Sequence, residues 1–154
     1  MTIIEKIDLT DWKQYSGIEF YQPEKVIKSL KQLYYLTEEN ENNNTYNIVL
    51  FSIGNNHCGT YYPAVKSALP IIIEIAQYGQ SEISRNCALE ILSDLNYCFS
   101  PEIEPYNEFD FQKLEKFVSD STELFLQQEP IQTESSRNQK LRMELIEYIQ
   151  DSNK

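Results

Sequence analysis

Apolar residues recur at three- and four-residue intervals along most of the chain, which is the spacing of one face of an α-helix. The pattern is clearest in five segments, which begin near Pro23, Pro63, Ser81, Asp110 and Ser135. Only four glycines occur in 154 residues, too few for the many tight turns of an all-β fold. We therefore predict a single all-α domain over residues 1–154, built from about six to eight helices joined by short loops.

Prolines, serines and glycines mark the expected ends of the central helices. Pro23 and Pro63 suit the first turn of a helix, and Ser81 suits an N-cap. Gly79 suits a C-terminal stop. Pro70 lies inside the apolar pattern that follows Pro63, so we expect it to kink or restart that helix.

Residues 46–53 fit either a short helix or a strand, because so short an apolar run has no decisive period. We favour a helix capped by Thr45 and stopped by Gly54. No second strand-like run is available to pair with a strand here, and a lone strand leaves its backbone groups unpaired. The polar, Asn-rich residues 38–45 are expected to form an exposed loop.

The chain is strongly acidic, with 13 basic and 24 acidic residues and a formal net charge of −11. This charge disfavours nucleic acid and anionic membrane surfaces as direct ligands, because both are bound through clustered Lys and Arg. The small basic face of Lys25, Lys28 and Lys31 is too limited to change that expectation. An acidic protein attracts cationic partners from a distance.

The acidic residues are concentrated in one window. Between Arg85 and Lys113 there are six acidic residues and no Lys or Arg. Carboxylates with interleaved tyrosines suit a protein-binding patch, because aromatic rings supply contact area and acids steer the encounter. A solvated acidic surface is the alternative. The predicted partner-binding residues are Glu90, Asp94, Tyr97, Glu102, Glu104, Tyr106, Glu108 and Asp110.

The sequence offers little for catalysis or metal binding. His57 is the single histidine, and its neighbour Cys58 is not expected to face it. Paired His, Cys-x-x-Cys and Gly-rich phosphate loops are absent from the sequence. Cys87 and Cys98 would lie about 16 Å apart along one helix, so we expect buried structural thiols and no disulfide. We predict no enzyme activity, cofactor or metal; a Cys–His enzyme is the less favoured alternative.

The chain also has no expected targeting or membrane segment. Met1–Leu9 carries Glu5, Lys6 and Asp8 among its apolar residues, unlike a secretory signal. The longest apolar block, Leu69–Ile73, is far short of the ~18 residues of a membrane span. We expect a cytoplasmic protein with reduced thiols.

The central third carries a recognisable pattern in residues 55–63, 68–70 and 84–92. It contains a His-x-Gly-Thr turn at His57, a helix with an inner Ala-x-Pro, and an Arg-x-x-Ala-Leu-x-x-Leu helix at Arg85. This pattern resembles bacterial HEAT-like helical proteins. Several such small acidic proteins look like immunity proteins of contact-dependent growth inhibition and related toxin systems. The resemblance covers about residues 46–101.

The resemblance implies a HEAT/armadillo-like array of stacked antiparallel helix pairs. Because a solenoid needs about three repeats to bury a continuous core, a chain this short is expected to form a compact array with atypical ends. We predict that the residues of this motif have structural roles. Gly59 frees the loop backbone, and His57 ties the loop down. Thr60 caps the next helix, and Pro70 bends its helix.

The resemblance also implies a function. A free monomer would bind and neutralise a cognate secreted toxin domain, a basic nuclease with ribonuclease favoured, by covering its active site or substrate groove. The alternative is a HEAT-like adaptor or regulatory module whose partner is not a toxin.

Overall fold

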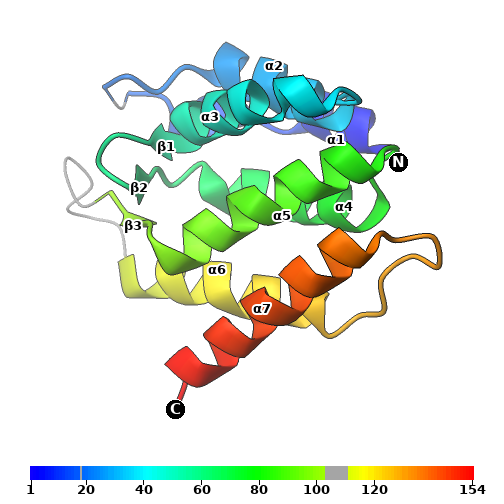
Figure 1. Ribbon diagram of the computed structural model, residues 1–154. Coiled ribbons are helices and arrows are strands. Elements are labelled where there is room, and N and C mark those ends of the chain that lie inside the picture. Colours follow the sequence, from blue (N-terminus) through cyan, green and yellow to red (C-terminus); the bar gives the residue numbers. More distant parts are fainter. Residues whose placement is uncertain (18, 103–110) are drawn as a thin grey trace.

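The computed structural model describes residues 1–17, 19–102 and 111–154, which form seven α-helices, two short 3-10 helices and a small sheet (Figure 1). The α-helices are α1 (Ile3–Leu9), α2 (Pro23–Tyr34), α3 (Asn42–Ile53), α4 (Val65–Tyr78), α5 (Glu82–Tyr97), α6 (Phe111–Leu126) and α7 (Ser136–Ser152). The 3-10 helices are η1 (Trp12–Tyr15) and η2 (Glu39–Glu41). The predicted all-α class is confirmed, and the HEAT-like relationship stays a prediction.

Consecutive helices pack as three pairs, α2 with α3, α4 with α5, and α6 with α7. The pairs stack on one another, with α4 and α5 in the middle layer (Figure 1). Helix α5 is therefore surrounded by α3, α4 and α7, and most of its residues are buried. This central position explains its long apolar pattern, since a helix enclosed on several sides needs a wide apolar face.

The helix ends predicted at Ser81 and Gly79 are confirmed, but Pro63 lies two residues before α4 and not in its first turn. Ser81 caps α5, and its hydroxyl oxygen accepts a hydrogen bond from the backbone N–H of Ser84 at 2.9 Å. Gly79 is the C-cap of α4. Its N–H donates to the Ile75 carbonyl at 2.7 Å, and its backbone then leaves the helical conformation with a ψ of 146°. Pro70 lies inside α4 without ending it, so of the two predicted effects, a kink or a restart, the restart is wrong.

The prediction of a helix over residues 46–53 is confirmed, but this helix starts earlier than expected. Helix α3 begins at Asn42, and η2 precedes it, so most of residues 38–45 are helical and the predicted loop is wrong. Thr45 is buried within α3 and does not cap it. Its hydroxyl oxygen accepts a hydrogen bond from Gln32 of α2 at 3.1 Å. Packing against α2 thus overrides the weak helix propensity of the Asn-rich segment.

A three-stranded sheet joins the ends of α3 and α5, and the sequence analysis did not predict it. Strands β1 (Gly54–Asn55) and β2 (Thr60–Tyr61) are antiparallel, and β2 pairs in parallel with β3 (Ser100–Pro101). Thr60 therefore lies in a strand, and the prediction that it caps the next helix is wrong.

His57 was predicted to tie down the loop between β1 and β2, and this loop is held by contacts of both His57 and Asn55. The His57 ring lies edge-on against Phe51, with ring centroids 4.9 Å apart. The side-chain oxygen of Asn55 accepts hydrogen bonds from the backbone N–H groups of His57 and Cys58. Gly59 has a φ of +66°, as its predicted role in freeing the loop backbone requires.

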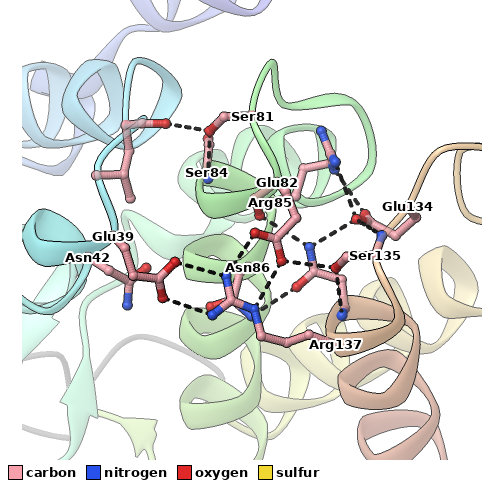
Figure 2. Close-up of polar contacts among 12 residues, drawn as sticks. Glu39, Asn42, Ser81, Glu82, Ser84, Arg85, Asn86, Glu134, Ser135 and Arg137 are labelled. Carbon is pink, nitrogen blue, oxygen red and sulfur yellow. Dashed lines mark hydrogen bonds and ion pairs between the residues drawn. The ribbon is translucent and has the colours of Figure 1, made fainter.

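A polar network fixes the start of α7 against α5 (Figure 2). Buried Arg85 donates to the Glu134 carboxylate at 2.9 and 3.3 Å. The Asn86 amide donates to the side-chain oxygen of Asn138 at 2.8 Å. Outside this buried layer, Arg137 is paired with Glu82 and Glu39. These contacts set how α7 lies along α5, and therefore which side chains the two helices present together.

Candidate protein-binding surface

The structure describes four of the eight predicted partner-binding residues, which are Glu90, Asp94, Tyr97 and Glu102. The other four, Glu104, Tyr106, Glu108 and Asp110, lie outside the described residues. A helix was predicted to begin near Asp110, and α6 is described from Phe111.

Two tyrosines meet where the C-terminal end of α5 lies against α7. The rings of Tyr97 and Tyr148 are 3.9 Å apart between centroids and tilted by 31°. The Tyr97 hydroxyl donates to the backbone carbonyl of Glu144 at 3.3 Å. Tyr97 is 40% exposed, so one face of this aromatic pair remains open to solvent. Large, rigid aromatic side chains in such positions are common anchors of protein interfaces.

Carboxylates surround the tyrosine pair. Burial raises the pKa of Tyr97, and the nearby charges of Glu144 and Glu147 and the Tyr148 phenol raise it further. Tyr97 therefore stays protonated at neutral pH and retains a hydrogen-bond donor. We call Asp94, Tyr97, Glu144, Glu147 and Tyr148 the α5–α7 surface.

Asp94 is the least compensated charge in this surface. Its side chain is half-buried, and burial raises the pKa of its carboxyl group. Within the described ranges, no hydrogen bond or ion pair reaches the Asp94 carboxylate. A desolvated charge without a partner opposes folding and marks a candidate functional residue.

Replacing Asp94 with Asn is expected to raise the free energy of unfolding at neutral pH by roughly 0.5–1 kcal/mol, discounted because the group is half-exposed. The pKa is higher in the folded chain than its ordinary value of 3.8, so the folded state binds more protons between the two values. Stability therefore falls as pH rises through that window. Urea denaturation near pH 7 and near pH 3 should show the gain only at the higher pH.

The matched control is Asp151→Asn, which neutralises an exposed carboxylate at the end of α7. It should leave stability within about 0.5 kcal/mol at both pH values. A loss of stability in Asp94→Asn near pH 7 would mean that this carboxylate has a stabilising partner.

The other two described candidates have structural partners. The Asn42 amide donates to Glu90 at 3.2 Å, which links α3 to α5. The Thr60 hydroxyl donates to the Glu102 carboxylate, and the Glu102 N–H donates to the Tyr61 carbonyl at 2.8 Å. Both carboxylates thus help to hold neighbouring elements together, whereas Asp94 and the α7 residues supply the acids around the tyrosine pair.

The α7 half of this surface lies outside the residues predicted from the sequence. Glu144 and Tyr148 are four residues apart in the last helix, so their shared face could be read from the sequence. The contact of this face with Tyr97 could not be predicted from the sequence, because it depends on how α7 crosses α5.

The three free cysteines lie in different environments. Burial, with a smaller contribution from Glu90, raises the pKa of the Cys87 thiol to about 12. Cys87 is buried as predicted, but Cys98 is exposed because it follows the last residue of α5, so the prediction of a buried thiol is wrong there. Cys58 is also exposed. Among the described residues, no cluster of three His, Cys, Asp or Glu side chains could hold a metal ion.

A thiol titration with Ellman's reagent at neutral pH should detect Cys58 and Cys98 in the folded protein, because thiol reactivity requires exposure and thiolate character. Cys87 should react only after unfolding in guanidinium chloride, when its pKa returns to the ordinary range. Single Cys→Ser variants would assign each reaction. Rapid reaction of Cys87 in the folded state would contradict its assignment as a structural thiol.

Comparisons with known proteins found no match to this chain among protein-family models, curated proteins or solved structures. In the part of the chain that the structure describes, no helix has the length and apolar character needed to cross a membrane. The functional proposal therefore rests on the α5–α7 surface, the charge of the chain and the sequence pattern.

Proposed function

We propose that this chain is an immunity protein that binds a cognate toxin domain, a basic nuclease, and blocks its active site or substrate groove. The supporting observation is the α5–α7 surface, where a partly exposed tyrosine pair lies beside the carboxylates of Glu144 and Glu147, and Asp94 lies one turn before Tyr97 on α5. Burial raises the pKa of the Asp94 carboxyl group, so we expect this charge to lower stability where it lies.

The chemistry of this surface suits a cationic protein groove. A net charge of −11 accelerates encounter with a basic partner. Carboxylates can occupy the positions that nucleic-acid phosphates take on a nuclease, while the tyrosine pair supplies a rigid contact that excludes water. The choice of a nuclease, with ribonuclease favoured, comes from the resemblance over residues 46–101.

The proposal places the protein in the cytoplasm as a free monomer until it meets its toxin. Three free thiols, two of them exposed, suit a reducing compartment. An immunity protein works as a stoichiometric inhibitor, so the proposal includes no cofactor and no reaction catalysed by this chain.

The direct test is co-purification with the product of the gene immediately upstream, at low and high salt. We expect a stoichiometric complex that silences a toxic nuclease activity and weakens as salt rises. If that neighbour is neither toxic nor bound, the immunity function is wrong, and the HEAT-like adaptor becomes the better proposal.

The double variant Glu144→Lys/Glu147→Lys should slow association with the toxin about tenfold at low salt, because it reverses charge beside the tyrosine pair. The difference should shrink at high salt. Tyr97→Ala should instead speed dissociation and weaken binding by about 2 kcal/mol, as expected for an aromatic anchor. Surface plasmon resonance at two salt concentrations separates the two effects.

The matched control is Glu38→Lys/Glu41→Lys, which makes the same charge change at two exposed residues, the N-cap and the last residue of η2. It should alter association far less, because those residues lie outside the α5–α7 surface. Equal slowing by both double variants would show that only net charge matters. If neither Tyr97→Ala nor Glu144→Lys/Glu147→Lys changes the binding kinetics, the interface lies elsewhere.

A further inference from the structure

A groove of about 840 Å³ lies along α2 and α3 and shares no residue with the α5–α7 surface. Its apolar lining includes Phe20, Ile48 and Phe51, which are 77%, 37% and 44% exposed. The Phe20 backbone has a φ of +69°, a strained conformation for a bulky residue. Apolar rings left open to solvent beside a groove are a feature of binding sites.

Two lysines give the groove a charge opposite to that of the whole chain. Lys25 and Lys28 are exposed, lie one turn apart on α2 and both line the groove. Within residues 1–17, 19–102 and 111–154 neither has an ion-pair partner, whereas Lys31 on the same helix pairs with Asp8 at 2.6 Å. Uncompensated cations beside an apolar surface, in a chain of net charge −11, favour an anionic ligand with apolar groups.

Five side-chain amides also line the groove, together with Ser52, Gly54, His57 and Tyr62. The amides belong to Gln22, Gln32, Asn44, Asn47 and Asn55. The side-chain oxygens of Asn47 and Asn55 already accept hydrogen bonds from Asn56 and from the loop backbone. Their NH₂ groups keep donor capacity, and amides of this kind pair well with the carbonyl groups of an extended peptide.

We propose that this groove binds a short, extended acidic peptide segment of a protein partner, with a bulky apolar side chain between its carboxylates. The lining residues Gln22 and Gln32 lie about 15 Å apart along α2, which four or five extended residues would span. The apolar side chain contacts Phe20, Ile48 and Phe51, and the carboxylates pair with Lys25 and Lys28. This site is separate from the surface of the proposed immunity function, because the two share no residue.

A synthetic peptide array tests the site directly. Each six-residue peptide carries Asp, Lys, Phe or Ser at each position, and the labelled full chain is the probe. The strongest signals should come from peptides that combine Asp with Phe. The best such peptide, carrying a fluorescein label, should lose about tenfold in affinity for the Lys25→Glu/Lys28→Glu variant in a fluorescence polarisation titration.

Two further variants keep the result interpretable. Lys140→Glu/Lys154→Glu makes the same change of charge on exposed residues of α7 and the C-terminus and should bind the peptide like the original chain. Phe20→Ser removes an exposed ring and should weaken binding while thermal unfolding stays unchanged.

Three outcomes would overturn the proposal. The first is an array signal that is no higher for Asp–Phe peptides than for Lys–Phe peptides. The second is an equal loss of affinity in both double-lysine variants. The third is a chain that binds the anionic dye anilinonaphthalene sulfonate but binds none of the peptides. The last result would assign the groove to a small anionic molecule. None of these results depends on the toxin experiment, so the two proposals fail separately.

Discussion

Replacing Glu134 with Gln is expected to lower the free energy of unfolding by about 3–5 kcal/mol, because it leaves the Arg85 guanidinium buried without its counter-charge. Arg85 and Glu134 are only 6% and 7% exposed. Their contact uses both carboxylate oxygens, as Figure 2 shows. A buried charge that loses its partner keeps its full desolvation cost, whereas an exposed one recovers water.

The geometry around Glu134 makes a neutral amide especially unsuitable. Its carboxylate also accepts from the Ser135 N–H at 2.9 Å and from the Asn138 amide at 3.0 Å. Four donors therefore point at two oxygens. A Gln side chain replaces one of those oxygens with an NH₂ group, which would face donors instead of acceptors. The N-cap of α7 is part of the same network, so the start of α7 should loosen.

Urea denaturation followed by circular dichroism measures this effect. The matched control is Glu82→Gln, which removes charge from a less buried carboxylate paired with Arg137 and should cost less than about 1 kcal/mol. Arg85→Met/Glu134→Leu should recover only part of the loss. An apolar pair needs no counter-charge, but the Ser135 N–H and the Asn138 amide lose the carboxylate that accepts from them. A near-neutral Glu134→Gln would mean that water or relaxation already compensates Arg85.

Gly54→Ala is expected to destabilise the protein by about 3 kcal/mol, because a methyl group has no room between β1 and β2. A Cβ atom at Gly54 would lie 2.1 Å from the Thr60 carbonyl oxygen and 2.7 Å from the Tyr61 Cα. Both are backbone atoms that cannot rotate away. The Gly54 backbone is extended, with a φ of −173°, so the cost is steric and not conformational. The two strands would have to separate.

Gly17→Ala supplies the contrasting control. At Gly17 an added Cβ meets no atom of the described residues within 4 Å, but the φ of +97° disfavours an L-residue. This change should cost about 1 kcal/mol through backbone strain alone. Thermal unfolding of both variants, with amide exchange at Tyr61 and Tyr62, would locate the damage. Equal costs in the two variants, with the β1–β2 amides still protected, would contradict a steric clash at Gly54.

The local features of this fold could be predicted from the sequence. The all-α class, the cap at Ser81 and the stop at Gly79 depend on side chains within a few residues of one another. A further local signal was present but overlooked at the N-terminus. Thr2 and Glu5 form a capping box at the start of α1, through reciprocal hydrogen bonds of 3.1 and 2.9 Å.

Other features required contacts between distant residues. The small sheet pairs Thr60 with Ser100, and two-residue strands have no period that a sequence pattern can reveal. Helix α3 starts at Asn42 because it packs against α2 and α5, where Asn42 also reaches Glu90. Propensity alone assigned those asparagines to a loop.

The candidate sites likewise combine features of neighbouring residues with features that depend on contacts between distant residues. The acidic charge, the tyrosine in α5 and the spacing of Asp94 and Tyr97 were present in the sequence, because charge and helical spacing are properties of neighbouring residues. Only the tertiary structure joined Tyr97 to Tyr148, whose helix is placed by the buried contacts of Arg85 and Asn138. The groove along α2 and α3 arose similarly, since a surface shared by two helices depends on how they pack.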